Sequence, residues 1–463
     1  MVVGDFCSAN LRDLQAWKCQ GLEISSTSSD AAVRLYDAAS RQFIGAIDDP
    51  QMGGLLATVK KMHQEDGDFA LGRALSVALN MAATRWSPEI VQLATQLDSD
   101  LKSAKMTERE KLHCRAALQI NQADLNQAGN IYDQILTSHP NDLFAMKMAQ
   151  LCYLFIGDSQ CMRDSAMRVI PKMDKSIPLA SFAYGLSGFG RQECHEYSEA
   201  EKETKLALQM NPQDAWAQHA LSHIHEMQHR AVEGRDTLMK TVDNWKPCNM
   251  LACHNTWHLA LHHIDLGEFD CAMQLFDEQI NSTLRAGNDE FEVSDAASLL
   301  YRLKIEGYTF SRHKWSSMLE LSRPHVDEHS NPFYDSMIYL AIIGAEDMKL
   351  REQFMESFEN EIRGVICKTT HALRDKLYLA MAAYQDGDFS ETVKVLWPIR
   401  SQLCKLGGSN AQRDMFTQIL TDACICAGDF AKARELISQR EAFGCGSGLV
   451  ARMNAKLSAA QND

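Results

Sequence analysis

The sequence predicts an all-α protein, an α/α superhelix built from helix–turn–helix repeats. Three observations lead to this prediction. Apolar residues recur with the helical period over most of the 463 residues, runs that alternate like β-strands are scarce, and similar segments return after roughly one repeat length. Only 10 prolines occur, so long helices are permitted. We expect a single helical-repeat superhelix over residues 1–463, without interdomain linkers.

The recurrence is clearest in two segments. Residues 122–142 read QADLNQAGNIYDQILTSHPND, and residues 194–214 read CHEYSEAEKETKLALQMNPQD. Each has a turn, an amphipathic helix, and a proline with Asn or Asp beside it, which is the pattern of the 34-residue tetratricopeptide repeat (TPR). The clearest repeats are expected, with approximate bounds, at residues 109–142, 181–214, 215–248, 253–286, 373–400 and 414–440.

The repeat requires small residues where its two helices cross, because a short interaxial distance leaves no room for large side chains. One helix pair cannot bury its apolar face alone, so successive pairs stack into a solenoid. Thr204 departs from the pattern, because an aromatic residue is expected there. The residues that match are Ala116, Ala128, Tyr132, Ile135 and Pro140; Gly188, Ala200, Ala207 and Pro212; Ala260, Gly267, Ala272 and Phe276; Ala380, Gly387 and Leu396; and Gly428, Ala433 and Ile437.

A turn tripeptide of Gly, an acidic residue and Phe recurs between paired helices, at residues 267–269, 387–389 and 428–430. Glycine at this position can end the first helix in the left-handed conformation, and the acidic residue can cap the second helix. The repeat phase is lost at residues 284–295 and 327–335, where we expect longer connections within the superhelix.

The charge and cysteine content bound the class of protein. The net charge is −15 and the sequence pI is near 5.5, which argues against nucleic acid as a general partner. The 14 cysteines include no C-x-x-C pair, and the N-terminus does not read as a secretory signal. We expect reduced thiols, a cytoplasmic protein and, since no apolar run reaches about 18 residues, no transmembrane segment.

Five stretches are similar to the tetratricopeptide repeat protein 38 family, and the similarity runs over essentially the whole chain. The resemblance implies an α-helical repeat protein of the cytosol or of vesicle surfaces. It implies no particular reaction. The stretches are LRDLQAWKCQGLEISSTSSDAA at residues 11–32, NPQDAWAQHALSHIHEM at 211–227, NMLACHNTWHLAL at 249–261, LYRLKIEG at 300–307 and LGGSNAQRD at 406–414.

Histidines are concentrated in one part of the sequence. Eight of the 16 fall between residues 219 and 263. His219 and His223 are spaced i,i+4, which puts them on one face of a helix, and His254 and His258 repeat this spacing 35 residues later. Both pairs are expected on the inner face of the first helix of their repeats, where such solenoids form a concave groove. The two registers differ by about one turn, so the pairs are expected either level or offset.

Two hypotheses for this histidine-rich groove stay open. In the first, His219, His223, His254 and His258 hold one divalent ion, because Zn, Fe, Mn, Cu and Ni all accept imidazole ligands. Glu226 or Asp265 would then add a carboxylate, as a ligand or as general base to a bound water. In the second, the groove is free of metal and binds a peptide or small ligand, or the histidines simply pack. The expected groove residues are His219, His223, Glu226, His254, Trp257, His258, Arg302 and Arg413.

Residues 225–229 form a literal H-E-x-x-H, the zinc motif of many metalloproteases. His225 is expected to point away from the face of His219 and His223, and His229 lies near the end of its helix. A third ligand further along the chain is also required by such enzymes. The sequence therefore favours a chance match.

Three further features invite a chemical interpretation. Cys253 is a candidate nucleophile, with His219 or His223 as its base, although a packed cysteine is the more ordinary interpretation. Gly407 and Gly408 would let backbone N–H groups approach an anion, but a glycine C-cap followed by a Ser409 N-cap is the more ordinary interpretation. Arg302 is expected to form an i,i+4 pair with Glu306.

The sequence therefore predicts a repeat protein that binds a protein, a peptide or a small ligand in its concave groove. The alternative is a metal-dependent enzyme, a hydrolase or an enzyme of oxygen chemistry. In that alternative the four histidines hold the ion and Glu226 or Cys253 is the catalytic candidate. A fold alone is a weak guide to function, so both hypotheses need the geometry of the site.

Overall fold

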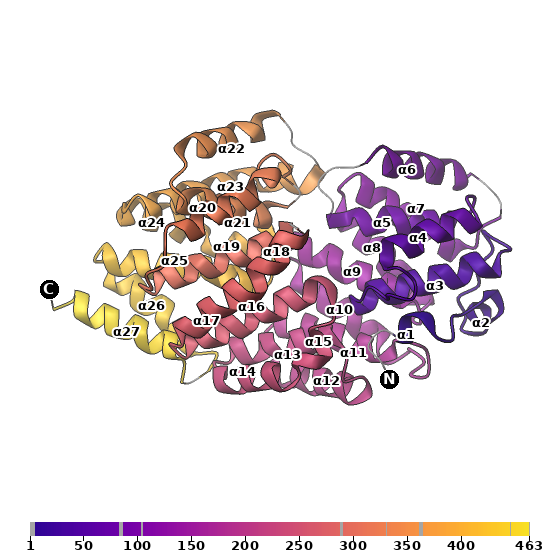
Figure 1. Ribbon diagram of the computed structural model, residues 1–463, viewed down its shortest axis with the longest axis horizontal. Helices are drawn as coiled ribbons and strands as arrows, with labels where there is room; N and C mark the ends of the chain where they lie inside the picture. Colours follow the sequence, from indigo (N-terminus) through magenta and orange to yellow (C-terminus); the bar gives the residue numbers. More distant parts are fainter. Residues whose placement is uncertain are drawn as a thin grey trace. The chain divides into compact units, whose positions relative to one another are not determined.

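The computed structural model describes residues 5–82, 87–102, 105–287, 290–329, 331–360, 364–444 and 446–462. These residues form helices and connecting turns, and no strand occurs among them (Figure 1). The all-α class predicted from the sequence is confirmed.

The first part of the chain contains fourteen α-helices and a short 3₁₀ turn, and most helices are paired with a sequence neighbour. They are α1 (Asp5–Ser8), α2 (Leu14–Cys19), α3 (Asp30–Gly45), α4 (Leu55–Glu65), α5 (Ala70–Leu79), η1 (Asn80–Ala82), α6 (Pro88–Asp100), α7 (Glu108–Asn121), α8 (Leu125–Ser138), α9 (Leu143–Ile156), α10 (Ser159–Val169), α11 (Ala180–Glu193), α12 (Tyr197–Met210), α13 (Ala215–Met227) and α14 (Ala231–Lys240).

The second part continues the same pattern, with one π-helical turn and two 3₁₀ segments between helices. Its elements are α15 (Val242–Trp245), α16 (Asn249–Asp265), α17 (Phe269–Leu275), η2 (Phe276–Ile280), α18 (Asn281–Gly287), α19 (Glu290–Ile305), α20 (His313–Ser322), η3 (Arg323–His325), α21 (Pro332–Gly344), α22 (Met348–Asn360), α23 (Gly364–Gln385), α24 (Phe389–Leu396), η4 (Trp397–Leu406), α25 (Asn410–Cys426), α26 (Phe430–Glu441) and α27 (Gly448–Ala460).

The chain divides into two compact units. The first comprises residues 1–221, 243–252 and 364–366, and the second comprises residues 222–242, 253–363 and 367–463. The boundary therefore runs through α13 and α16. The sequence predicts one superhelix over residues 1–463, and that arrangement stays a prediction.

The predicted repeats correspond to helix pairs. The repeats at 109–142, 181–214 and 215–248 are the pairs α7–α8, α11–α12 and α13–α14, and those at 253–286, 373–400 and 414–440 contain α16–α17, α23–α24 and α25–α26. Residues expected at helix crossings are fully buried, among them Ala116 and Ala128. At Gly188 a Cβ atom would lie 2.2 Å from the Thr204 hydroxyl, so only glycine lets α11 and α12 approach this closely.

The glycines of the turn tripeptides adopt the expected left-handed conformation. Gly267, Gly387 and Gly428 have φ values of 77°, 79° and 74°. The side chains of Asp388 and Asp429 cap the following helices, as predicted. The Glu268 carboxylate does not cap a helix, because it binds His263 and Arg235 instead.

The two predicted long connections are shorter than expected. Within residues 284–295, α18 continues to Gly287 and α19 begins at Glu290. Within residues 327–335, α21 already begins at Pro332, where Asn331 caps the helix and proline occupies its first position. These helices do not follow the repeat phase, which is why the sequence pattern missed them. None of the described helices is long and apolar enough to cross a membrane.

Candidate metal centre

Helices α13 and α16 contact each other through polar side chains. The Ser222 hydroxyl lies 3.0 Å from Nε2 of His262. Further along the same contact, the rings of His223 and His258 meet edge to face, with centroids 4.4 Å apart. A larger residue than serine would separate the helices here. All four residues belong to the second unit.

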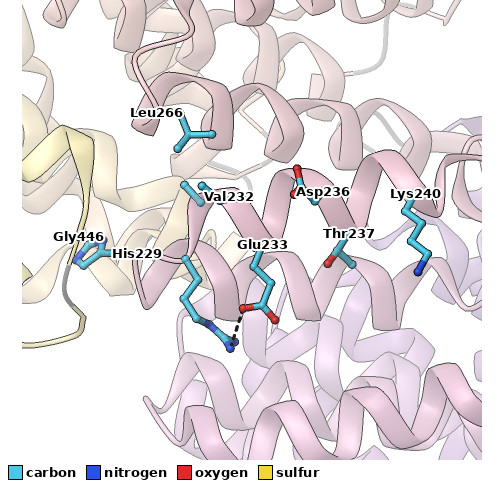
Figure 2. Close-up of a pocket in the computed structure, with 10 residues that line it drawn as sticks. His229, Val232, Glu233, Asp236, Thr237, Lys240, Leu266 and Gly446 are labelled. Carbon is cyan, nitrogen blue, oxygen red and sulfur yellow. Dashed lines mark ion pairs between the residues drawn. The ribbon is translucent and has the colours of Figure 1, made fainter.

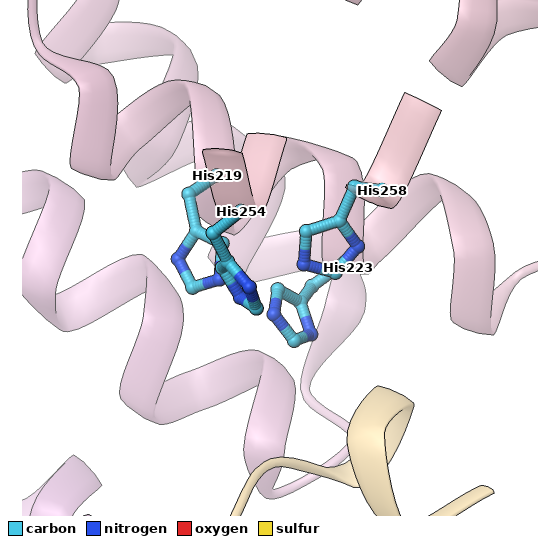
Figure 3. A group of neighbouring side chains, drawn as sticks. All are labelled: His219, His223, His254 and His258. Carbon is cyan, nitrogen blue, oxygen red and sulfur yellow. The ribbon is translucent and has the colours of Figure 1, made fainter. Parts of the chain in front are cut away.

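Four imidazoles converge at these two helices (Figure 3). His219 and His223 come from α13, and His254 and His258 come from α16. One ring nitrogen of each lies within 4.8 Å of those of the other three. The i,i+4 spacing places the two clustered histidines of each helix on one face. The second pair follows the first by 35 residues, about one repeat length, so the two pairs can meet. The histidine set expected from the sequence is therefore brought together.

Two carboxylates contact the clustered histidines of α16, His254 and His258. Nδ1 of His254 lies 2.7 Å from a carboxylate oxygen of Asp295 on α19. Nδ1 of His258 lies 3.0 Å from a carboxylate oxygen of Glu226 on α13. In metal sites a carboxylate at Nδ1 fixes the tautomer that carries the proton there, and Nε2 is then the metal-binding nitrogen. Carboxylate–histidine pairs of this kind accompany most histidine ligands in metalloproteins.

The cluster lies in the protein interior. The four histidines are each at most 4% exposed. Burial holds the pKa of His223 well below its usual value, and the neighbouring His254 and His262 act in the same direction. Neutral imidazole is the form that binds a metal ion. The environment of His223 therefore favours its metal-binding form.

The residues expected to line an open groove include side chains that are buried. Trp257 is fully buried, stacks on the His254 ring and donates its indole N–H to Ser298 at 3.0 Å. The physical reason is α19, which supplies Asp295 and Ser298 to the side of α16 that the repeat pattern would leave open. The four histidines and Trp257, expected to line a groove, are thus buried, and ligand binding at these positions stays a prediction.

The two arginines expected in the groove have structural partners. Arg302 is buried, donates to the backbone carbonyl of Ala411 at 2.7 Å, and lies 3.6 Å from Asp414. Arg413 donates to the Gly407 carbonyl at 3.1 Å. Both guanidinium groups thereby fix the N-terminal region of α25. The expected anion site at the glycines is not supported, since Arg413 binds carbonyls there.

The i,i+4 pair predicted between Arg302 and Glu306 does not form. Arg302 faces Asp414 on α25, and Glu306 pairs with Arg452 on α27. Tertiary partners replace the local one because α19 packs between other helices of the second unit. The Ser409 N-cap was predicted correctly: its hydroxyl accepts from the Gln412 N–H in a capping box.

Glu226 has a different position from the one expected of a ligand or general base. One of its oxygens accepts from Nδ1 of His258, so the carboxylate lies behind a candidate ligand. It also lines a cavity of about 40 Å³, together with Arg302, Asp414 and Arg440. Burial raises the pKa of the Glu226 carboxyl to about 8, and Arg302 partly opposes this effect. The structure assigns Glu226 an orienting contact to His258.

Asp265, the other carboxylate considered as a ligand, is engaged elsewhere. It accepts hydrogen bonds from the Ser447 hydroxyl at 2.7 Å and from the Leu449 N–H at 2.8 Å. It thereby stabilises the start of α27. The sequence did not single out Asp295, which takes the role of second carboxylate beside the cluster.

The H-E-x-x-H motif is not a metalloprotease site. His225 points toward Glu233, 3.5 Å away, and is not one of the four clustered histidines. His229 lies beyond the end of α13 with a φ of 59°, and its Nε2 lies 3.0 Å from the Arg440 carbonyl. The motif therefore does not present its two histidines to one ion, as the sequence analysis expected.

Cys253 is a buried thiol in the first part of α16. It precedes His254 in the helix, so the two side chains point about 100° apart. A catalytic role for Cys253 stays an untested prediction. Twelve cysteines of the described residues form no disulfide.

An open cavity of about 570 Å³ lies along α14 in the second unit (Figure 2). Its wall combines charged and apolar side chains. Arg230 and Glu233 form an ion pair at 3.3 Å, and Val232 is 53% exposed. The other lining side chains labelled in Figure 2 are His229, Asp236, Thr237, Lys240 and Leu266. No motif in the sequence pointed to this cavity.

The fold and the site define a class: an α-helical repeat protein with a buried cluster of four histidines. No known family profile matches the chain. A solved structure, the crystal structure of the P58(IPK) TPR domain, is similar to it at 12% identity, covering 71% of this chain and 90% of that one, with a TM-score of 0.20. A score this low carries no argument, so the repeat fold rests on the helix pairs and their crossings.

Proposed function

We propose that this chain is a metal-binding helical-repeat protein in which His219, His223, His254 and His258 hold one divalent transition-metal ion. The observation that carries the proposal is the pairing of the cluster with carboxylates. Nδ1 of His254 binds Asp295 and Nδ1 of His258 binds Glu226, which is the carboxylate–histidine pairing that accompanies most histidine ligands in metalloproteins. Imidazole ligands suit Zn, Cu, Fe and Ni.

Charge balance supports the same proposal. Four neutral imidazoles around a divalent ion leave two positive charges in the interior, and burying an uncompensated charge costs several kcal/mol. The Asp295 carboxylate supplies one negative charge behind His254, whereas burial favours the protonated form of the Glu226 carboxyl behind His258. A packing role for the histidines requires no such compensation, since neutral rings carry no charge.

The buried position favours a structural ion over a catalytic one. A tetrahedral ion with four protein ligands has no position left for substrate, whereas catalytic zinc keeps one open. All four ligands are at most 4% exposed. The ion would therefore cross-link α13 and α16. The metal-enzyme alternative receives less support than metal binding itself.

Elemental analysis of the full chain tests the proposal. We expect close to one equivalent of a transition metal per chain, lost in the double variant His223→Ala and His258→Ala. His313→Ala is the matched control, because His313 is exposed on α20. The proposal would be refuted if the protein contained no metal and its unfolding midpoint stayed the same with chelator and with added Zn, Cu, Ni, Fe or Mn ions.

A second candidate function is the binding of a protein or peptide, which is common for repeat scaffolds. The specific observation in its favour is the open cavity along α14, with an exposed Val232 and charges of both signs around it. An extended peptide with an apolar anchor and flanking charges suits such a wall. The site would then lie beside α14 and not at the histidines.

A peptide array probed with the full chain tests this second function. Peptides that bind should lose affinity with Val232→Asp and keep it with Val91→Asp. The control is matched, because Val91 is 50% exposed on α6. Equal binding by both variants would remove the α14 cavity as the site.

A further inference from the structure

A second chemical constellation lies in the second unit, outside the histidine cluster. It consists of Asp335 on α21, Ser357 on α22, and His329 in the segment before α21. Nε2 of His329 lies 2.9 Å from the Ser357 hydroxyl. Nδ1 of the same ring lies 3.0 Å from a carboxylate oxygen of Asp335. These are the contacts of a serine–histidine–aspartate triad.

Asp335 and His329 are more deeply buried than Ser357. The side chains of Asp335 and His329 are 1% and 2% exposed, whereas Ser357 is partly exposed. A triad requires this order, because the acid must be shielded and the nucleophile must be reachable. The aromatic rings of Phe354 and Phe358 contact the His329 ring, with centroids 5.7 Å and 3.8 Å away. They fix its orientation between the two partners.

The backbone at His329 is held in an uncommon conformation. Its φ is 51°, in the left-handed region that residues other than glycine rarely occupy. Both ring nitrogens have partners at hydrogen-bond distance, which offsets this strain. Strained residues with fixed side chains recur at functional sites.

We propose that Ser357 is a nucleophile for acyl transfer, with His329 as its general base and Asp335 as the positioning residue. The substrate class is a carboxylic ester. The Ser357 hydroxyl also donates to the Phe354 carbonyl at 2.6 Å, and rotation about the Cβ–Oγ bond redirects its single proton toward His329. Asp335 holds the tautomer that carries a proton on Nδ1, so Nε2 can accept.

The reaction is balanced without any cofactor. Oγ of Ser357 attacks the ester carbonyl carbon as its proton passes to Nε2 of His329. The bond to the alkoxy oxygen breaks, and the alcohol leaves with that proton. Water then attacks the acyl-serine with His329 again as base, which releases the carboxylic acid and restores the serine.

A fluorophosphonate probe tests the nucleophile on the full chain. Oγ forms a bond to phosphorus, fluoride leaves with the electron pair of the P–F bond, and the proton passes to His329. We expect one adduct per chain, located on Ser357 by peptide mass spectrometry and absent in Ser357→Ala. The control Ser316→Ala, on an exposed position of α20, should label like the unchanged chain.

The labelling rate separates catalysis from packing. His329→Gln should slow labelling at least a hundredfold, because a general base contributes about 10²–10⁴. Asp335→Asn should also slow it, while leaving the carboxamide in the same space. Two results would overturn the proposal: no adduct on Ser357 when a control serine hydrolase labels fully, or an unchanged rate in an Asp335→Asn or His329→Gln chain that keeps the normal unfolding midpoint.

Discussion

Replacing Asp295 by asparagine tests the metal centre without touching a ligand. The carboxylate lies 2.7 Å from Nδ1 of His254, a short, charge-assisted contact. Asparagine keeps the shape but removes the negative charge. It can also turn its amide N–H₂ toward Nδ1, which would move the ring proton to Nε2 and occupy the nitrogen that should bind the ion. We therefore expect weaker metal binding in Asp295→Asn.

The size of the effect follows from the role of the contact. Partners behind a histidine ligand typically contribute 10- to 100-fold in metal affinity, or about 1.4–2.7 kcal/mol. At a free ion concentration 100 times the dissociation constant, the bound ion stabilises the fold by about 2.7 kcal/mol. A tenfold weaker variant keeps about 1.4 kcal/mol of this, and a hundredfold weaker one about 0.4 kcal/mol. The difference is large enough to measure by unfolding.

Competition with a chromogenic chelator gives the affinity, and denaturant unfolding with and without the ion gives the stability. Asp98→Asn is the matched control, because Asp98 is an exposed carboxylate on α6 that pairs with the surface residue Lys102. If Asp295→Asn binds the ion as tightly as the control variant does, the carboxylate does not orient a ligand. The metal centre as we have drawn it would then be wrong.

Four other predictions concern packing, capping and pH. Gly234→Ala should destabilise the fold by about 1–3 kcal/mol in denaturant unfolding, because the new Cβ would lie 2.3 Å from the buried His262 ring; a stabilised variant would show that the ring moves freely. Gly188→Ala should cost a similar amount, about 1–3 kcal/mol, and Thr204→Ala should restore only part of it, since the Ala200 carbonyl also lies 3.0 Å from the new atom; full additivity in the double-mutant cycle would contradict this contact. Ser409→Ala should cost about 1 kcal/mol, because it removes one half of the capping box of α25, whereas an unchanged midpoint would mean that water replaces the cap. Burial lowers the pKa of His262 from 6.5 to about 3, so the unfolded chain binds a proton between these values and the folded chain does not. Stability should therefore fall as the pH drops below about 6.5, by up to about 1.4 kcal/mol per pH unit from this group, and the fall should flatten in His262→Gln when unfolding is followed at several pH values.

The fold follows from local rules that the sequence displays directly. Small residues at helix crossings, such as Ala116 and Gly188, and turn glycines such as Gly267 are needed wherever a repeat packs on itself. Their spacing therefore predicts the helix pairs. Segments 284–295 and 327–335 were expected to be connections, because their helices have no repeat partner in phase. The Asn331 cap and the following proline were the local signals that a helix starts there.

The site was predictable only as far as the repeat extends. His219, His223, His254 and His258 were found because their positions recur from one repeat to the next. Asp295 has no such signal: it lies 41 residues after His254, on a helix outside the repeat phase. The contact of Ser357 with His329 likewise depends on how α21 and α22 pack, which no spacing in the sequence reveals.

The location of the cluster suggests why a repeat protein would use an ion here. The stability of stacked helix pairs is close to a sum of nearest-neighbour contacts, so one weak contact limits the whole array. At the contact of α13 and α16, two histidine rings meet and the Ser222 hydroxyl contacts a third. An ion shared by both helices would add coordination bonds to this contact. Removal of the ion should therefore lower the protection of α13 and α16 in amide hydrogen exchange more than that of α7 and α8. Equal loss in both pairs would instead indicate that the ion acts on the fold as a whole.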